Sequence, residues 1–275
     1  MKKHDFKNKK VLITGASMGI GRALAFEFAK RGAHLALCAL PRDNKLLESL
    51  AGELKKSYGI KTWIFPIDLT EKDGPDRLHR DVKKEVGDIY ALVNNAGTIA
   101  YGKFWEIPLE NQEQIYRINF LVPLKLMRLF IGDMVKKKEG VVFNTSSVSG
   151  LQPTPFHSVY GATKAGLQSL SEGVRIELRG TGVSVCTLNP SYVETALVKV
   201  KGFPKKMRWY MISGLARPEW VAKKALVAFE KDTFLYVPGM WAKFLHLFLI
   251  KISSRRLVNF LAYYSLQGVK KQGHY

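Results

Sequence analysis

Short apolar runs alternate along the chain with longer segments whose apolar residues recur every three or four positions. The short runs predict buried strands, and the periodic segments predict helices that each bury one face. We expect strands at residues 10–14, 34–39, 61–66, 89–93, 140–144, 183–188 and 234–237. We expect helices at residues 22–31, 44–58, 76–86 and 111–138, and a further helix that ends near residue 179. This alternation is typical of an α/β fold in which a doubly wound parallel sheet forms the middle of three layers.

The first expected strand runs directly into a glycine-rich turn. Residues 14–21 read TGASMGIG, and a helix and a second strand follow. This order is the first unit of a Rossmann-like fold, where glycines let backbone N–H groups approach a pyrophosphate at a helix N-terminus. Any tight turn can use such glycines, but their place after the first strand favours a dinucleotide site.

The composition predicts one large domain with a full core, because 47% of the 275 residues are apolar. We expect this domain to cover residues 1–238 and a basic amphipathic extension to cover 239–275. Cys38 and Cys186 lie in separate apolar runs, which favours free thiols in a reducing compartment. The six histidines are scattered, so we expect no metal site, although His157, in the loop before Tyr160, could face substrate.

The net charge of +20 is unevenly distributed, since residues 199–275 hold 15 Lys and Arg against 3 Asp and Glu. Such a charge attracts phosphates, nucleic acid or anionic lipid alike. No nucleic-acid recognition motif is present, so we expect no nucleic-acid partner. The basic N-terminal arm lacks a following apolar region, and no apolar run is long enough to span a bilayer. We therefore expect a cytoplasmic protein, either free or peripheral at the cytoplasmic face of the membrane.

Tyr160 and Lys164 are four residues apart and would lie on one face of the helix that ends near residue 179. A lysine there would stabilise the phenolate and lower the tyrosine pKa from its usual value near 10. Such a tyrosine can exchange a proton with an alcohol or carbonyl oxygen. Taken alone, the pair favours the simpler interpretation as two surface residues.

Together the motifs resemble the short-chain dehydrogenase/reductase family over residues 10–238. The matching elements are TGASMGIG (14–21), Asp68-Leu69, NNAG (94–97), Asn119, Ser147, YGATK (160–164) and Asn189-Pro190. They occur in the order and at the spacings of that family. The resemblance implies a nicotinamide cofactor, reversible hydride transfer between a carbonyl and an alcohol, and a homodimer or homotetramer.

The resemblance also implies a catalytic set. Tyr160 would give a proton to the carbonyl oxygen, and Lys164 would lower its pKa and bind the nicotinamide ribose. Ser147 would orient the substrate oxygen, with Ser146 as the alternative. Asn119 would hold a water that links Lys164 to solvent.

The implied cofactor contacts come from the glycine-rich turn and from the ends of several strands. They are Gly15, Ser17, Met18, Gly19, Ile20, Gly21, Arg42, Asp68, Leu69, Asn95, Ala96, Gly97, Tyr160, Lys164, Pro190, Val193 and Thr195. Ser191 stands where the family usually has glycine.

The end of the second strand decides the expected coenzyme. Ala39 stands where an NAD enzyme would place an acidic residue, and Arg42 could pair with a 2′-phosphate. The carboxylate of Asp43 would favour NAD(H), but we interpret Asp43 as the N-cap of the next helix. Met18 stands where the family often has a basic residue, and the absence of that residue argues against NADP(H). We favour NADP(H), with NAD(H) as the alternative.

Residues 193–216 correspond to the substrate lid of the family. The lid is basic and aromatic, which suits a long apolar substrate with an acidic head group, although its apolar face could equally be core. Tyr101, Phe104 and Trp105 could add to an apolar pocket or be buried in packing. The extension at 239–275 mixes aromatic and basic residues, which suits a helix in an anionic membrane surface, a subunit contact or a cover over the substrate.

These features favour an NADPH-dependent reductase of a ketone on a lipophilic substrate of the 3-oxoacyl, sphingoid, steroid or retinoid type. One alternative is an NAD-dependent alcohol dehydrogenase working in the oxidative direction. The other is a dinucleotide-binding scaffold or sensor without turnover, for which a tuned tyrosine would be unnecessary.

Overall fold

The structure, a computed structural model, describes residues 3–200, 202–205, 207–208 and 214–267. Parts of the expected lid (201, 206 and 209–213) and the end of the extension (268–275) lie outside the described residues.

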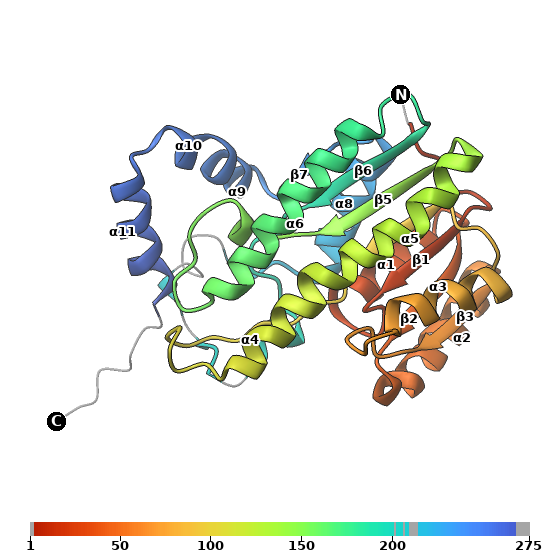
Figure 1. The fold of residues 1–275 in the computed structure, drawn as a ribbon, viewed down its shortest axis with the longest axis horizontal. Coiled ribbons are helices and arrows are strands. Elements are labelled where there is room, and N and C mark those ends of the chain that lie inside the picture. Colours follow the sequence, from red (N-terminus) through yellow and green to blue (C-terminus); the bar gives the residue numbers. More distant parts are fainter. Residues whose placement is uncertain (1–2, 201, 206, 209–213, 268–275) are drawn as a thin grey trace.

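A seven-stranded parallel sheet forms the centre of the molecule (Figure 1). Its strands lie in the order β3-β2-β1-β4-β5-β6-β7. Their bounds are β1 Lys10–Thr14, β2 His34–Ala39, β3 Thr62–Pro66, β4 Ala91–Asn94, β5 Gly140–Thr145, β6 Val183–Leu188 and β7 Leu235–Tyr236. The strand order reverses between β1 and β4, and ligands of such sheets bind beyond the carboxyl ends of the strands at that point. The expected doubly wound, Rossmann-like, three-layer fold is confirmed.

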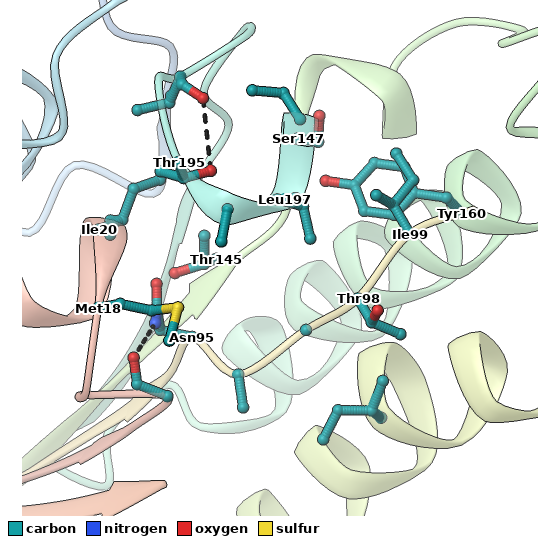
Figure 2. A pocket seen from close by; sticks show the side chains of 18 of the residues that line it. Met18, Ile20, Asn95, Thr98, Ile99, Thr145, Ser147, Tyr160, Thr195 and Leu197 are labelled. Carbon is teal, nitrogen blue, oxygen red and sulfur yellow. Dashed lines mark hydrogen bonds between the residues drawn. The ribbon is translucent and has the colours of Figure 1, made fainter. Parts of the chain in front are cut away.

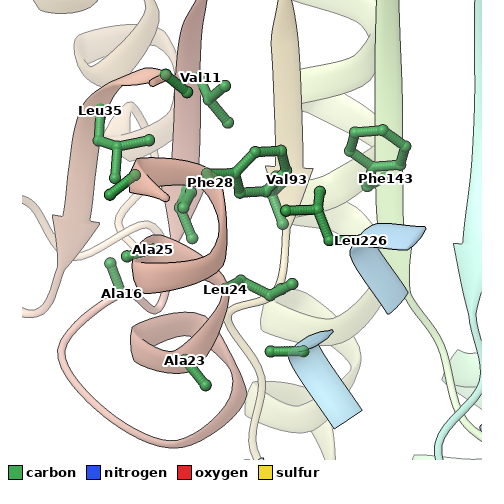
Figure 3. Packing of buried hydrophobic residues seen from close by; sticks show 14 of the residues in the cluster. Val11, Ala16, Ala23, Leu24, Ala25, Phe28, Leu35, Val93, Phe143 and Leu226 are labelled. Carbon is green, nitrogen blue, oxygen red and sulfur yellow. The ribbon is translucent and has the colours of Figure 1, made fainter. Parts of the chain in front are cut away.

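Helices cover both faces of the sheet. On one face, α1 (Gly19–Ala29), α2 (Asn44–Tyr58) and α8 (Pro218–Glu230) bury their apolar sides. Figure 3 shows this core, where Leu24 and Phe28 of α1 and Leu226 of α8 surround Val93 and Phe143 of the sheet. On the other face, the core includes α3 (Gly74–Glu85), α5 (Val122–Lys137) and the end of α6 (Ser158–Glu177).

The helix expected at 111–138 is interrupted. It consists of α4 (Leu109–Tyr116), a π-helical turn (Arg117–Leu121) and α5. Pro123 explains the interruption, because it has no N–H to donate to the carbonyl of Asn119 four residues earlier. π-Helical turns of this kind are frequent at functional sites.

The chain continues beyond β7 into α9 (Met240–Phe244), a π-helical turn (Leu245–Leu249), α10 (Ile250–Ile252) and α11 (Arg255–Leu266). These elements lie together at one end of the molecule in Figure 1, with α2 at the other end. Within the described residues, none of the helices combines the length and the apolar character that crossing a bilayer requires. The expected division at residue 238 stays a prediction.

The two cysteines are free and buried, as expected. Burial raises the pKa of the Cys38 thiol to about 12, so it is an inert core residue at neutral pH.

Candidate active site

A cavity of about 540 Å³ opens at the carboxyl ends of the strands. The residues that we predicted for cofactor binding line it, with Gly21 as the exception. They are Gly15, Ser17, Met18, Gly19, Ile20, Arg42, Asp68, Leu69, Asn95, Ala96, Gly97, Tyr160, Lys164, Pro190, Val193 and Thr195. Segments far apart in the sequence therefore meet at one site, although the role of each residue there stays a prediction.

The glycine-rich turn has a backbone that only glycine adopts easily. Gly15 and Gly19 have φ values of +65° and +57°. A Cβ on Gly15 would lie 2.9 Å from the Cα of Ala96, so the turn also needs glycine for close packing. Gly21 lies behind the cavity wall, because a Cβ there would lie 2.1 Å from the carbonyl oxygen of Gly15. Gly21 therefore has a packing role in the turn, and its predicted cofactor contact stays a prediction.

The N-terminus of α1 fits an anionic group. Met18 occupies the N-cap position, where its side chain makes no capping hydrogen bond, and the first turn holds no acidic residue. The first N–H groups of a helix have no partner within the helix, and here no side chain caps them. A pyrophosphate would satisfy these N–H groups and would be favoured by the helix dipole.

Tyr160 and Ser147 come together at the other end of the cavity. Figure 2 shows the Tyr160 hydroxyl pointing toward Ser147. The Ser147 hydroxyl accepts a hydrogen bond from the backbone N–H of Ser149 (3.1 Å), which fixes its position. The Ser146 hydroxyl instead donates to the carbonyl of Lys164 (2.9 Å). Ser147 is therefore the serine that faces Tyr160, in agreement with the preferred register.

The expected pKa of Tyr160 was wrong in direction. Burial raises the pKa of Tyr160 to about 12, and the nearby Ser147 hydroxyl opposes this rise without reversing it. The ammonium nitrogen of Lys164 lies 5.6 Å from the centre of the Tyr160 ring and does not offset this effect of burial. At neutral pH, Tyr160 is accordingly a protonated acid.

Lys164 is buried and donates a hydrogen bond to the carbonyl of Thr145 (2.8 Å). Burial lowers its pKa to about 8, because the charged ammonium is removed from water. An ammonium has three donors, and among the described residues only the Thr145 carbonyl accepts from this one. Lys164 can therefore donate to a ligand in the cavity, as the predicted contact with a ribose requires.

Asn119 lies within the π-helical turn and is fully buried. Its side-chain oxygen accepts from the N–H of Thr98 (3.0 Å), and its amide donates to the carbonyl of Thr98 (2.9 Å). The side chain thus holds the loop after β4 against the helix and does not itself line the cavity. The predicted water beside Asn119 stays a prediction.

Arg42 and Asp43 lie in the turn that follows β2, and both line the cavity. Asp43 was expected to cap α2, but its side chain makes no capping hydrogen bond and accepts one from the Ser17 hydroxyl (3.0 Å). Its partner lies in the glycine-rich turn, which local sequence patterns do not reveal. Arg42 is exposed, and no carboxylate among the described residues forms an ion pair with it.

The substrate side of the cavity is apolar. Ile99, Tyr160, Phe203 and Met207 form a buried cluster, so described residues of the expected lid contribute to it. Val193 and Ala216 form an isolated bridge that brings the two ends of the lid together. Phe104 and Trp105 are exposed, by 57% and 78%, so their predicted place in a pocket or a core was wrong.

Several lining residues were missed from the sequence. They include Thr98, Ile99, Ile118 and Thr145. Thr98 and Ile99 directly follow the NNAG motif, which was the available signal. His157, which the sequence had placed in the loop before Tyr160 as a residue that could face substrate, lines the cavity, and burial lowers its pKa to about 4. Its ring is therefore neutral at pH 7.

These elements define a dinucleotide-binding oxidoreductase site, and the comparisons agree. The sequence model of the short chain dehydrogenase family matches residues 9–204. The chain belongs to this family, whose members are NAD(P)-dependent oxidoreductases.

Two relatives are ketoacyl reductases by name. The very-long-chain 3-oxoacyl-CoA reductase of Anas platyrhynchos is 34% identical over 194 residues, which cover 69% of this chain and 61% of that protein. A ketoacyl reductase from a Nostoc species is 31% identical over 225 residues, which cover 82% of this chain and 76% of the relative. The chain thus aligns with less than two thirds of the first of these proteins.

A solved structure is similar over most of both chains. A short-chain dehydrogenase from Sphingobium yanoikuyae, in complex with NADPH, superposes with a TM-score of 0.78 at 27% identity. The match covers 90% of this chain and 97% of that one.

Proposed function

We propose that the chain reduces the keto group of a lipophilic 3-oxoacyl thioester, with NADPH as the hydride donor. The observation that carries the proposal is the position of Ser147 and Tyr160 between an anion-binding helix N-terminus and an apolar lid. The names of the two ketoacyl reductases favour a 3-oxoacyl substrate over the sphingoid, steroid and retinoid alternatives.

The residues of the cavity fit the parts of a dinucleotide. The free N–H groups of α1 would hold the pyrophosphate, and Asp68 with Leu69 would contact the adenine. Lys164 would donate to the nicotinamide ribose, and Thr195 would contact the pyrophosphate or the carboxamide. When bound, NADPH supplies a hydride to the carbonyl carbon of the substrate.

Tyr160 performs the proton transfer. Because its pKa is raised to about 12, it holds its proton at pH 7 and can donate it from the phenolic oxygen to the substrate oxygen. Ser147, held by the N–H of Ser149, orients that substrate oxygen by a hydrogen bond. The apolar residues of the lid exclude water and would hold the acyl chain next to the reacting carbonyl.

NADPH is favoured over NADH because Arg42 is available for a 2′-phosphate. Asp43 also lines the cavity and keeps its negative charge while it accepts from Ser17, so it opposes this preference in part. The NADPH complex of the Sphingobium relative supports the same choice.

The alternatives fit the site less well. An NAD-dependent alcohol dehydrogenase would place an acidic residue at the end of β2, where this chain has Ala39. A scaffold or sensor would have no need for a buried tyrosine, serine and lysine around a substrate space. We further propose assembly as a homodimer or homotetramer and a location at the periphery of the membrane.

A coenzyme-oxidation screen tests the proposal. Loss of NADPH absorbance is followed with 3-oxoacyl-CoA substrates of increasing chain length, with a steroid ketone and a small polar ketone as comparisons. We expect kcat/KM to rise with acyl length, since each additional buried CH₂ contributes about 0.8 kcal/mol. Turnover of the polar ketone alone, with every 3-oxoacyl thioester inert, would exclude the proposal.

A further inference from the structure

Exposed large apolar side chains are concentrated on the terminal helices. Half of those that the described chain exposes lie between residues 240 and 264. They are Met240, Trp241, Phe244, Phe248, Ile252, Leu257, Phe260, Leu261, Tyr263 and Tyr264. Met240 and Trp241 are 88% and 81% exposed, so they contribute little to the core of the fold. We call these ten residues the aromatic face.

The aromatic face is ordered by helical spacing. Trp241, Phe244 and Phe248 follow one another at three- and four-residue intervals, and their rings are 6.4 and 5.6 Å apart. The opposite side of this segment buries His246. In α11, Ala262 and Leu266 are buried, whereas Phe260 and Tyr264 stack on each other and stay 65% and 52% exposed. The helices therefore pack on the protein through a few side chains and expose most of their large apolar ones.

The charge of this region is uniformly positive. No Asp or Glu follows Asp232 in the sequence. The basic residues of this stretch are Lys243, Lys251, Arg255, Arg256, Lys270 and Lys271. Lys243, Arg255 and Arg256 are exposed. An apolar surface with basic residues and without acidic ones complements anionic lipid.

A second copy of the chain complements this surface less well. In a two-fold contact through the aromatic face, Lys243, Arg255 and Arg256 of both copies would be brought together without an acidic partner from the same stretch. Like charges at an interface oppose association, whereas anionic headgroups offset them.

The aromatic face is attached to the substrate side of the active site. Tyr101 donates a hydrogen bond from its hydroxyl to the carbonyl of Leu266 (2.7 Å), and its ring packs on Phe203 of the cavity. Arg208 of the lid donates to the carbonyl of Tyr264 (3.2 Å) and stacks on its ring at 3.9 Å. A surface bound to α11 therefore lies next to the loops that enclose the substrate.

We propose that α9–α11 bind the surface of an anionic lipid bilayer through the aromatic face. The helices lie in the interface, with aromatic side chains among the acyl chains and basic side chains at the headgroups. This contact holds the lid side of the cavity at the bilayer. It does not depend on the hydride-transfer reaction, because it rests on residues outside the cavity.

Sedimentation with lipid vesicles tests this proposal on the full chain. Vesicles of phosphatidylcholine and phosphatidylglycerol in equal parts are compared with vesicles of phosphatidylcholine alone, at low and at high salt. We expect binding to the anionic vesicles that weakens with salt, and much weaker binding to the neutral ones. Absence of binding to anionic vesicles at low salt would overturn the proposal.

Two pairs of substitutions separate the apolar from the charged contribution. Phe244→Ala with Phe248→Ala should weaken vesicle binding at every salt concentration. Arg255→Gln with Arg256→Gln should weaken it roughly 30-fold at low salt, from about 1 kcal/mol per basic residue.

The matched control is Lys55→Gln with Lys56→Gln, which removes two exposed charges from α2 at the other end of the molecule (Figure 1). This pair should leave vesicle binding within about twofold if the contact is local. If the control pair weakened vesicle binding as much as the Arg255 and Arg256 substitutions, net charge alone would explain the binding. That result would overturn the assigned surface. A change from dimer to monomer in the Phe variants, without vesicle binding by the wild type, would make the surface an interface between copies and also overturn it.

Discussion

Substitution of Asn119 separates two roles for this residue: a water chain, as the family resemblance implies, and attachment of a loop, as the structure shows. The resemblance assigns it to a water chain, but the structure shows its side chain holding both backbone groups of Thr98 at 3.0 and 2.9 Å. Asn119→Ala removes both hydrogen bonds and leaves the loop after β4 without its attachment to the π-helical turn. This loop continues from Asn95, Ala96 and Gly97, which line the cavity.

The expected cost follows from the two backbone groups. An unpaired buried donor or acceptor costs about 1–3 kcal/mol, and Thr98 is half-buried, so the lower part of that range applies. We expect Asn119→Ala to lower the free energy of unfolding by about 2–4 kcal/mol. NADPH affinity should fall as well, because the loop no longer holds its position in the cavity.

Urea unfolding followed by circular dichroism, with and without NADPH, measures both effects. Asn111→Ala is the matched control, since Asn111 lies exposed in α4 and should change stability by less than about 0.5 kcal/mol. A variant at Asn119 that unfolds like the wild type yet loses turnover would refute the structural role. Asn119 would then act through a water on the proton path.

Two further predictions concern the coenzyme. Arg42→Ala should weaken NADPH binding roughly tenfold or more, since it removes a hydrogen-bonded charge from the 2′-phosphate, and should leave NADH binding nearly unchanged. An equal loss of affinity for both coenzymes in a fluorescence titration would contradict this role of Arg42. Lys164 has a pKa lowered to about 8, so its charge is present below that pH and is lost above it. NADPH affinity of the free protein should therefore be constant up to about pH 7 and fall between about pH 8 and about pH 10, and a flat profile in the same titration would count against Lys164 as a cofactor contact.

Much of the fold could be predicted because its signals are local and strong. The strand at Lys10–Thr14 is an apolar run that ends in glycines, and both the strand and the turn occur where expected. The π-helical turn was missed, although Pro123 was a visible signal that the long helix could not continue regularly.

The sequence predicted most residues of the site, but it could not predict their burial or their hydrogen-bond partners. Spacing placed Lys164 near Tyr160, but it could not show that both side chains would be buried, and burial decides the direction of both pKa shifts. Asp43 was expected to cap a helix because local signals favour that role, whereas its partner Ser17 is 26 positions away. Gly21 matched the motif, but only the structure shows that it packs against Gly15.

The central claim is that Tyr160 donates the proton in a carbonyl reduction. Tyr160→Phe removes the hydroxyl and keeps the buried ring, so the fold and the cavity should be preserved. The measurement is NADPH oxidation by the wild type and the variant with the best 3-oxoacyl-CoA of the screen, together with NADPH affinity for each. We expect kcat to fall by roughly 100-fold to 10,000-fold, the usual contribution of a general acid, with NADPH affinity unchanged within about twofold. A variant that keeps its NADPH affinity and retains kcat within about tenfold of the wild type would contradict the account.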